Sequence, residues 1–407
     1  MTQAGSPAQT PPRKQNLALA ALALGGFTIG TTEFATMGIL TNIADGLGVS
    51  IPTAGHAITA YALGVVVGAP VIAVLTARMS RSTLVAWLMG AYAVANLMSA
   101  LAPSMEVLIL GRFIAGLPHG VFFGVGAVVG TAVVGQAKRG HAISMMLGGL
   151  TIANVVGVPL SSWVGTHLGW QAAFVIVGVL GFVALTALIA LLPKVAPEPG
   201  ANPRSELAAL KNGRLWAMFL AAAIGFGGMF AVYSYVKPLV MFEAGMAESS
   251  VPFVLALFGL GMTAGTFFAG RLMDINVVRT VITGFITTSV SLVFLGVVGS
   301  NIPLILCALF AIGFTSQLLA LPLQGLLMDL SPKAPSLGAA LCHSALNTAN
   351  ANGAFLGGLF IAWEFGYRSL AWLGLGLTVL GFVLVLAFLP RKKPRDLEAL
   401  IESAPTE

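Results

Sequence analysis

Runs of apolar residues, separated by short polar or charged stretches, recur along the whole chain. The hydrocarbon core of a bilayer is about 30 Å thick, and an α-helix that crosses it needs about 20 such residues. We therefore predict an all-α polytopic membrane protein with twelve transmembrane helices. The predicted spans lie at about 17–40, 54–76, 83–101, 105–134, 142–165, 170–192, 215–242, 251–273, 279–299, 302–327, 336–362 and 369–389.

The stretch PKVAPEPGANPRSELAALKNGR interrupts this pattern and divides the spans six plus six. It is rich in proline and charge, which is typical of a linker. The first apolar run follows Arg13 and Lys14, but it is too long for a signal peptide and contains Glu33, so we interpret it as a retained helix. The predicted order is a cytoplasmic tail, a six-helix bundle, a cytoplasmic linker, a second six-helix bundle and a cytoplasmic tail, at 1–16, 17–192, 193–214, 215–389 and 390–407.

The composition supports a membrane protein. Of the 407 residues, 57% are hydrophobic and 8% are charged, whereas charged residues make up about a quarter of a soluble protein. The many glycines allow helices to approach closely in lipid. Two cysteines in apolar stretches indicate small buried side chains instead of a disulfide framework or a metal site. We expect no metal and no cofactor.

The positive charges orient the chain. With the amino terminus in the cytoplasm, the 20 Lys and Arg fall on the cytoplasmic side, except Arg368 in an outer loop and Arg112 and Lys237 inside spans. Positive charge resists translocation, so we place both termini in the cytoplasm and the chain in the plasma membrane, the inner membrane of a bacterium. This distribution explains the net charge of +6 without a nucleic-acid partner. The expected surroundings are the lipid bilayer.

The two halves contain a repeat. ANVVGVPL at 153–160 and ANANGAFL at 349–356 match in Ala, Asn, Gly and Leu, and similar outer loops follow them, GWQ at 169–171 and GYR at 366–368. The loop after the second span also aligns with the loop after the eighth. Parallel duplication is one way in which transporters build a binding site between two halves. We therefore predict two pseudo-symmetric six-helix bundles.

Several motifs, in their order and spacing, resemble those of a known family. They are GTTEF at 30–34, SIPTAGHAITAYALGVVVGAP at 50–70, GRFIAGLPHGVFFGVGA at 111–127, GLTIANVVGVPL at 149–160, YVKPL at 235–239 and GRLMD at 270–274. The sequence resembles the major facilitator superfamily, within it the twelve-helix drug:proton antiporter branch and the bacterial sugar-efflux and chloramphenicol-efflux permeases. The resemblance implies a central cavity that opens alternately to each side, with the proton as coupling ion. It also implies gating roles for Gly157 and Pro159, through close helix packing and a local bend.

The loop after the second span departs from the family's pattern. The family motif G-x-L-x-D-R-x-G-R corresponds to residues 73–81, where Arg78 and Arg81 are present but Ala77 replaces the aspartate. The second copy keeps an acid, Asp274. The resemblance therefore implies that the two arginines and Asp274 are gating residues. The alternative for Asp274 is a gate that closes mainly by packing. The alternative for the arginines is that they only supply positive charge on the cytoplasmic side.

Glu33 is the only acidic residue that we place well inside a span. Such a residue is expected to face the protein interior or a water-filled cavity and to have a function. Arg112 lies at similar depth and matches the span-four arginine that the resemblance implicates in proton transfer. His119 follows on the same helical face and can titrate near neutrality. We predict that these three residues couple transport to protons; a structural ion pair or a packing hydrogen bond is the alternative for each.

Other polar and aromatic residues repeat at helical spacing. Amides and imidazoles can hydrogen-bond a ligand or a neighbouring helix, and aromatic rings suit an amphipathic organic substrate. The predicted substrate-cavity residues are Met37, Phe123, Asn154, Phe230, Tyr233, Gln317, His343, Asn347 and Asn350. For the seventh span, the alternative is an interfacial aromatic belt from which Lys237 reaches the outer surface.

Together, these features predict a proton-coupled secondary transporter that acts as a monomer. It would export a small organic molecule, such as a drug, a sugar or a nucleoside-like compound, by alternating access. The alternative is an uptake symporter or a passive facilitator of a small polar solute. An enzyme is not expected, because neither H-E-x-x-H nor G-x-S-x-G occurs and the five histidines are scattered.

Overall fold

The computed structural model contains helices and no strand in the part of the chain that it describes. The described residues are 12–76, 78–135, 138–196, 212–330 and 335–388. Most of the predicted tails and linker, and Ala77, lie outside them. Eleven helical segments in the described part are long and apolar enough to cross a membrane. The all-helical prediction is confirmed, and the count of twelve stays a prediction.

The first half of the chain contains nine α-helices and one π-helical turn, η2, in its described residues. They are α1 (Pro12–Gly38), α2 (Leu40–Leu47), α3 (Ile51–Leu75), α4 (Arg81–Ala100), α5 (Met105–Gly116), α6 (His119–Val134), α7 (Arg139–Ile152), η2 (Ala153–Gly157), α8 (Val158–Leu168) and α9 (Trp170–Leu191). The span predicted at 105–134 is broken between α5 and α6 at Pro118, because proline cannot donate a backbone hydrogen bond within a helix. The span predicted at 142–165 runs through α7, η2 and α8.

The described second half begins with short elements and continues with long helices. They are α11 (Gly213–Gly225), α12 (Gly227–Tyr233), α13 (Val236–Pro238), η3 (Leu239–Glu243), η4 (Glu248–Ser250), α14 (Val251–Val297), α15 (Ile302–Asp329), α16 (Pro335–Ala362) and α17 (Ser369–Phe388). α14 holds two predicted spans and bends at Asn276, where φ is −166° and ψ is 106°. The Asn276 side chain accepts the backbone N–H of Arg279 at 2.9 Å and so caps the second arm.

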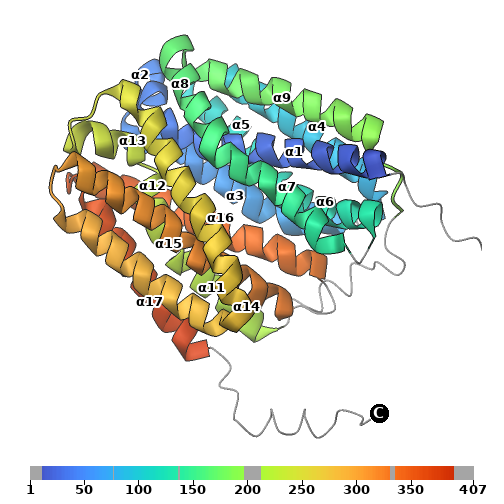
Figure 1. Ribbon diagram of the computed structural model, residues 1–407. Coiled ribbons are helices and arrows are strands. Elements are labelled where there is room, and N and C mark those ends of the chain that lie inside the picture. Colours follow the sequence, from blue (N-terminus) through green and yellow to red (C-terminus); the bar gives the residue numbers. More distant parts are fainter. Residues whose placement is uncertain (1–11, 77, 136–137, 197–211, 331–334, 389–407) are drawn as a thin grey trace, which may run out of the picture.

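Helices pack mostly within their own half. α1 packs on α7, α3 on α5 and α4 on α9; in the second half the two arms of α14 pack on α15, α11 on α17 and α12 on α16. In Figure 1 the blue to green helices lie on one side and the yellow to red ones on the other. The halves meet mainly where α3 lies along α16 and where α14 lies against η2 and α8, and α6 also packs on α16.

Many large apolar side chains are exposed on the outer faces of the helices. Trp87, Phe267 and Val290 expose 69%, 67% and 63% of their surface. Soluble monomers rarely expose apolar patches of more than a few hundred Å². A lipid-facing surface explains this exposure.

The contact between α1 and α7 depends on a glycine. A methyl group at Gly149 would meet the backbone carbonyl of Ala23 and would lie 2.8 Å from the backbone nitrogen of Phe27. A methyl group at the preceding residue, Gly148, would meet nothing within 4 Å. Of these two glycines, Gly149 is therefore the one whose missing side chain allows the backbones of α1 and α7 to approach.

Two ends of the molecule can be distinguished. The α2 end carries α2, α13, η3 and η4 (Figure 1). An ion pair at 3.5 Å between Glu243 of η3 and Arg368 places the start of α17 at this end too. The opposite end carries the start of α1 and the end of α17.

Candidate functional site

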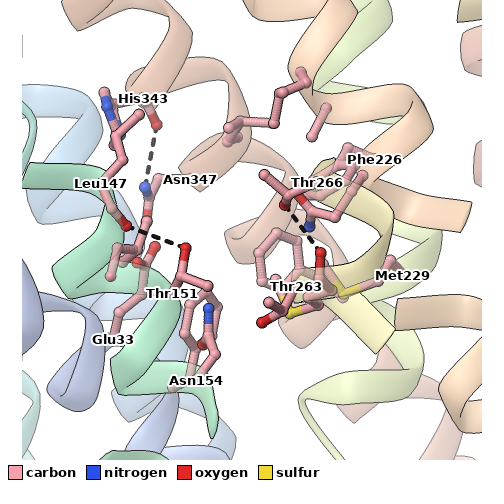
Figure 2. A pocket seen from close by; sticks show the side chains of 18 of the residues that line it. Glu33, Leu147, Thr151, Asn154, Phe226, Met229, Thr263, Thr266, His343 and Asn347 are labelled. Atoms are coloured by element: carbon pink, nitrogen blue, oxygen red, sulfur yellow. Dashed lines mark hydrogen bonds between the residues drawn. The ribbon is translucent and has the colours of Figure 1, made fainter. Parts of the chain in front are cut away.

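A cavity of about 140 Å³ lies between the two halves of the chain. Its lining residues include Glu33, Phe34, His119, Thr151 and Asn154 from the first half, and Phe226, Phe230, Thr263, Gln317, His343 and Asn347 from the second. Among the lining residues in the described part of the chain, Glu33 is the one carboxylate, and none is Lys or Arg. Figure 2 shows the side chains of the two halves facing each other. The described lining therefore consists of apolar and uncharged polar side chains around one acidic side chain.

Glu33 lies on α1 and is buried, with 7% of its surface exposed. Among the described residues its one ion-pair contact is with His119, whose Nε2 lies 4.0 Å from Oε2. This distance suits a weak ion pair and is too long for a hydrogen bond. Asn347 of α16 lies beside the carboxyl group (Figure 2), so the second half of the chain reaches the acid of the first.

Arg112 of α5 is fully buried close to this site. Its Nη2 donates to the backbone carbonyl of Thr32 at 3.2 Å, one residue before Glu33. The guanidinium lies over the ring of Tyr61, 4.2 Å from its centroid, and 5.3 Å from the centroid of Phe174. In the described part of the chain no ion pair of 4.0 Å or less joins Arg112 to Glu33. The cation is thus held mainly by aromatic faces and one carbonyl.

His119 opens α6 and is 1% exposed. Its Nδ1 lies 2.9 Å from the hydroxyl of Tyr61, while Nε2 faces Glu33. The imidazole also lies 5.6 Å, centroid to centroid, from the ring of His343 on α16. Of the three residues predicted to couple protons, Glu33 and His119 meet directly, and Tyr61 connects His119 to Arg112.

Tyr61 was missed by the sequence analysis. It lies within SIPTAGHAITAYALGVVVGAP, one of the motifs that carry the family resemblance. The residues around it in the sequence do not indicate that its hydroxyl has a polar partner. Its 1% exposure is ordinary for a core aromatic residue. Only the packing of α3 on α5 and α6 reveals its role.

Five of the nine predicted substrate-cavity residues line the cavity. They are Asn154, Phe230, Gln317, His343 and Asn347. Phe123 instead lies behind it, with its ring stacked on His343 at 5.0 Å. Met37 and Tyr233 lie further toward the α2 end, and Asn350 is fully buried deeper in the packing of α16. These four share helices with lining residues but differ from them in depth or in face.

The predicted gating loop is bound to the start of the linker. Arg81 is buried, and its backbone N–H donates to the carbonyl of Val195 at 2.9 Å. The hydroxyl of Ser80 donates to the same carbonyl at 3.0 Å. Arg78 is exposed, and the side chain of Asp274 lies outside the described side chains. The contacts that the structure describes for this loop therefore tie it to the linker.

Gly157 and Pro159 flank the end of η2. Pro159 has no N–H to donate to the carbonyl of Val155, which accounts for the loss of regular α-helical bonding here. Gly157 packs on the side chain of Thr31 of α1, and the backbone carbonyl of Asn154 lies against Gly259 of α14. The turn thus lies where both halves approach closely.

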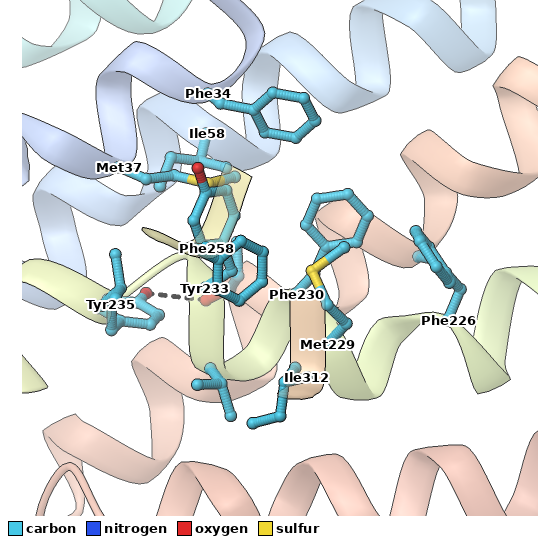
Figure 3. Packing of buried hydrophobic residues seen from close by; sticks show 14 of the residues in the cluster. Phe34, Met37, Ile58, Phe226, Met229, Phe230, Tyr233, Tyr235, Phe258 and Ile312 are labelled. Carbon is cyan, nitrogen blue, oxygen red and sulfur yellow. Dashed lines mark hydrogen bonds between the residues drawn. The ribbon is translucent and has the colours of Figure 1, made fainter. Parts of the chain in front are cut away.

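Aromatic rings from both halves close the cavity toward the α2 end. We call Phe34, Phe230, Tyr233 and Phe258 the aromatic cluster; Figure 3 shows them with Met37. The ring of Phe34 stacks on Phe230 at 6.2 Å, and Tyr233 stacks on Phe258 at 4.2 Å. All four are buried. On the side of the cavity that faces the α2 end, side chains of α1 and α12 are therefore packed against each other.

Beyond the aromatic cluster lies a polar group of four side chains, which we call the polar clasp. It joins Asn42 and Thr166 of the first half to Lys237 and Glu248 of the second. The Lys237 Nζ donates to Glu248 Oε1 at 2.6 Å and to Asn42 Oδ1 at 2.5 Å. Glu248 also accepts from Asn42 at 3.0 Å and from Thr166 at 3.3 Å. Lys237 is fully buried and does not reach the outer surface, contrary to the belt alternative.

The described residues hold no group of three or more His, Cys, Asp or Glu side chains that could bind a metal ion. The protein has a cavity that both halves of the chain line and that is closed at one end. A membrane protein with this arrangement is a solute transporter.

Comparison with known proteins agrees with this arrangement. The sequence model of the Major Facilitator Superfamily matches residues 22–253 and, in a second match, residues 232–404. The chain is 35% identical to the inner membrane transport protein YdhP of Escherichia coli (strain K12) over 387 residues, 93% of this chain and 97% of that one. It is 37% identical over 262 residues to a chloramphenicol resistance protein of Streptomyces lividans, covering 63% and 67% of the two chains. It is 24% identical over 368 residues, 90% and 92% of the two chains, to a probable sugar efflux transporter of Mannheimia succiniciproducens.

The chain therefore belongs to the major facilitator superfamily of membrane transporters. This confirms the resemblance to that family and to its chloramphenicol-efflux and sugar-efflux members. The members of this family are transporters, which are not generally enzymes.

Proposed function

We propose that this protein exports small organic molecules across the bacterial inner membrane in exchange for protons. The carrying observation is Glu33, a single buried carboxylate in a cavity that both halves line. The names of two relatives, a chloramphenicol resistance protein and a sugar efflux transporter, support export. The two halves would act as six-helix bundles of one monomer, with twelve spans.

The proposal includes an orientation. Because positive charge is retained in the cytoplasm, the chain termini lie inside and the α2 end faces outward. The aromatic cluster and the polar clasp would then close the outer side of the cavity, and the structure would correspond to a state closed to the outside. Opening would require these contacts between the halves to separate.

The proton cycle follows from the chemistry of a buried acid. An ionised carboxylate is costly to enclose in an apolar cavity, and protonation removes that cost. A proton taken up from outside would neutralise Glu33 and allow the halves to close around it. Release of that proton to the cytoplasm would restore a charge that draws water and substrate into the open cavity. Arg112 stays protonated and biases the carboxyl toward release.

The lining favours an uncharged amphipathic substrate. Phe226 and Phe230 offer apolar faces, while Asn154, Thr263 and Gln317 offer neutral hydrogen-bonding groups. A drug of the chloramphenicol kind, a sugar or a nucleoside-like compound has both surfaces. None of the described lining residues is Lys or Arg, so they offer an anionic substrate no counter-ion.

Glu33→Gln is the variant that tests the function. In everted vesicles with an imposed pH gradient, we expect the wild type to accumulate at least one compound of a panel containing chloramphenicol, a sugar and a nucleoside. The variant should fall to the level of vesicles that lack the protein, because an amide cannot carry a proton. Exchange of labelled for unlabelled substrate without a gradient should persist.

Glu106→Gln is the matched control. Glu106 is exposed on α5, and its carboxylate accepts a hydrogen bond from nearby Ser104 at 2.6 Å. This variant should transport like the wild type. Gradient-driven accumulation by Glu33→Gln at the wild-type level would refute the proposal. Equilibration that ignores the gradient in the wild type would indicate a passive facilitator, and accumulation in the opposite direction an uptake symporter.

A further inference from the structure

Tyr61 contacts two of the residues assigned to proton coupling and is itself assigned no role by the sequence. Its hydroxyl lies 2.9 Å from Nδ1 of His119, and its ring lies 4.2 Å below the guanidinium of Arg112. From these contacts, and resting on the proposed function, we infer that Tyr61 is a positioning residue. Its hydroxyl holds Nδ1 of His119 so that Nε2 faces Glu33, with or without its hydrogen according to the charge of Glu33.

The argument starts from the two nitrogens of a neutral imidazole. One carries a hydrogen and donates, and the other accepts. When the hydroxyl of Tyr61 donates to Nδ1, the hydrogen of His119 must be on Nε2, which then directs its N–H at the ionised carboxylate of Glu33 from 4.0 Å as an electrostatic contact. When Nδ1 carries the hydrogen and donates to the hydroxyl oxygen, Nε2 directs its lone pair at the protonated carboxyl.

A tyrosine hydroxyl can serve both states because it donates and accepts. Glu33 gains one proton between the two states, and the hydrogen of the imidazole changes from Nε2 to Nδ1. Tyr61 keeps a hydrogen bond to Nδ1 throughout and loses no proton overall. The orientation of its hydroxyl therefore follows the charge of Glu33.

The ring of Tyr61 has a separate effect on Arg112. Its face and that of Phe174 hold the guanidinium without a carboxylate partner. Nη2 donates to the carbonyl of Thr32, so the cation is anchored on α1 next to Glu33. The carboxyl of Glu33 is thereby left free to exchange its proton instead of being locked in an ion pair.

The pH response of this site depends on every charged or titratable group that faces it. Those groups come from α3, α4, α5, α6, α12 and α16. They are Tyr61, Tyr92, Arg112, His119, Tyr233 and His343. Of these, Tyr61 alone bonds to the nitrogen of His119 that faces away from Glu33.

Tyr61→Phe removes the hydroxyl and keeps the ring under Arg112. We expect it to retain gradient-free substrate exchange and thermal stability. The midpoint of the pH dependence of gradient-driven transport should shift by about half to one pH unit, the size expected from the loss of one hydrogen bond. In a His119→Gln background the same substitution should produce no further shift.

Tyr235→Phe is the matched control. Tyr235 is another fully buried tyrosine, but its hydroxyl donates to the backbone carbonyl of Ala354 at 2.7 Å and not to His119. This variant should keep the wild-type pH profile. A wild-type profile for Tyr61→Phe, or an equal shift for Tyr235→Phe, would overturn the inference.

A second measurement does not depend on a variant at Tyr61. In the wild type labelled with ¹⁵N-histidine, and assigned by the loss of one signal in His119→Gln, His119 should show a single dominant tautomer at alkaline pH, with hydrogen on Nε2. A mixture of tautomers there would contradict the inference. If Glu33→Gln transports normally, the proposed function itself fails; if it does not and Tyr61→Phe is unaltered, only the role of Tyr61 fails.

Discussion

Glu248→Gln is expected to destabilise the protein by about 2–3 kcal/mol and to open its α2 end. The substitution leaves Lys237 as a fully buried cation without its carboxylate, and the loss of one partner from a buried pair is strongly destabilising. This is less than the loss of about 3–5 kcal/mol that is typical of a fully buried pair, because the Glu248 side chain is 36% exposed and water replaces part of the lost interaction. The melting temperature in detergent measures this change.

Two further variants separate the clasp from a general charge effect. Glu243→Gln removes another acid at the α2 end, whose pair with Arg368 is 3.5 Å long and partly exposed on both sides. Such pairs contribute about 1 kcal/mol or less, so this variant should melt near the wild type. The double variant Lys237→Met with Glu248→Gln should recover much of the loss, because an apolar side chain replaces the unpaired cation.

The opening itself can be followed with a thiol reagent. Met37 is fully buried beneath the clasp, so a cysteine placed there by Met37→Cys, with Cys307 and Cys342 changed to serine, reports access from the outside. Labelling should be slow with an intact clasp and faster with Glu248→Gln. Unchanged labelling together with an unchanged melting temperature would show that the clasp does not hold the halves together.

Gly149→Ala should destabilise the first half by about 1–3 kcal/mol, the usual effect of overpacking. The added methyl group would meet the backbone of Ala23 and Phe27, which cannot move aside like a flexible side chain. α1 would have to separate from α7, and Glu33 would be displaced with it. Both the melting temperature and gradient-driven transport should fall.

Gly148→Ala provides the comparison for this prediction. A methyl group there has open space, and alanine favours a helix by about 1 kcal/mol over glycine. Gly148→Ala should therefore be as stable as the wild type or slightly more so. Equal losses for the two variants would show that the α1–α7 contact does not require Gly149.

The fold was predictable as far as hydrophobic length determines it. The long apolar runs became helices because a bilayer imposes both length and internal hydrogen bonding. The breaks were not predicted: the span with Pro118 divides into two helices, and Asn276 bends α14 between two spans. Such local features depend on the neighbours that fill the resulting gap, and hydropathy does not describe them.

The sequence predicts those residues of the candidate site whose side chains are unusual for their position, such as a titratable side chain inside an apolar run. Glu33 and His119 stand out in apolar runs, and the structure brings them together at the cavity. Tyr61 was not found, because a tyrosine in a helix is not anomalous. The polar clasp was not found either, since Lys237 pairs across the two halves with residues from distant parts of the chain.

The polar character of α16 has a consequence for how the chain enters the membrane. This helix carries the polar wall of the cavity, including Asn347 and Asn350, and is not one of the eleven segments that are apolar enough to cross by themselves. Polar residues near the centre of a segment disfavour its transfer from the translocon into lipid. α3, synthesised earlier, lies along α16 in the folded protein and can shield its amides from lipid. Because α3 is synthesised before α16, it is already present when the polar residues of α16 enter the membrane.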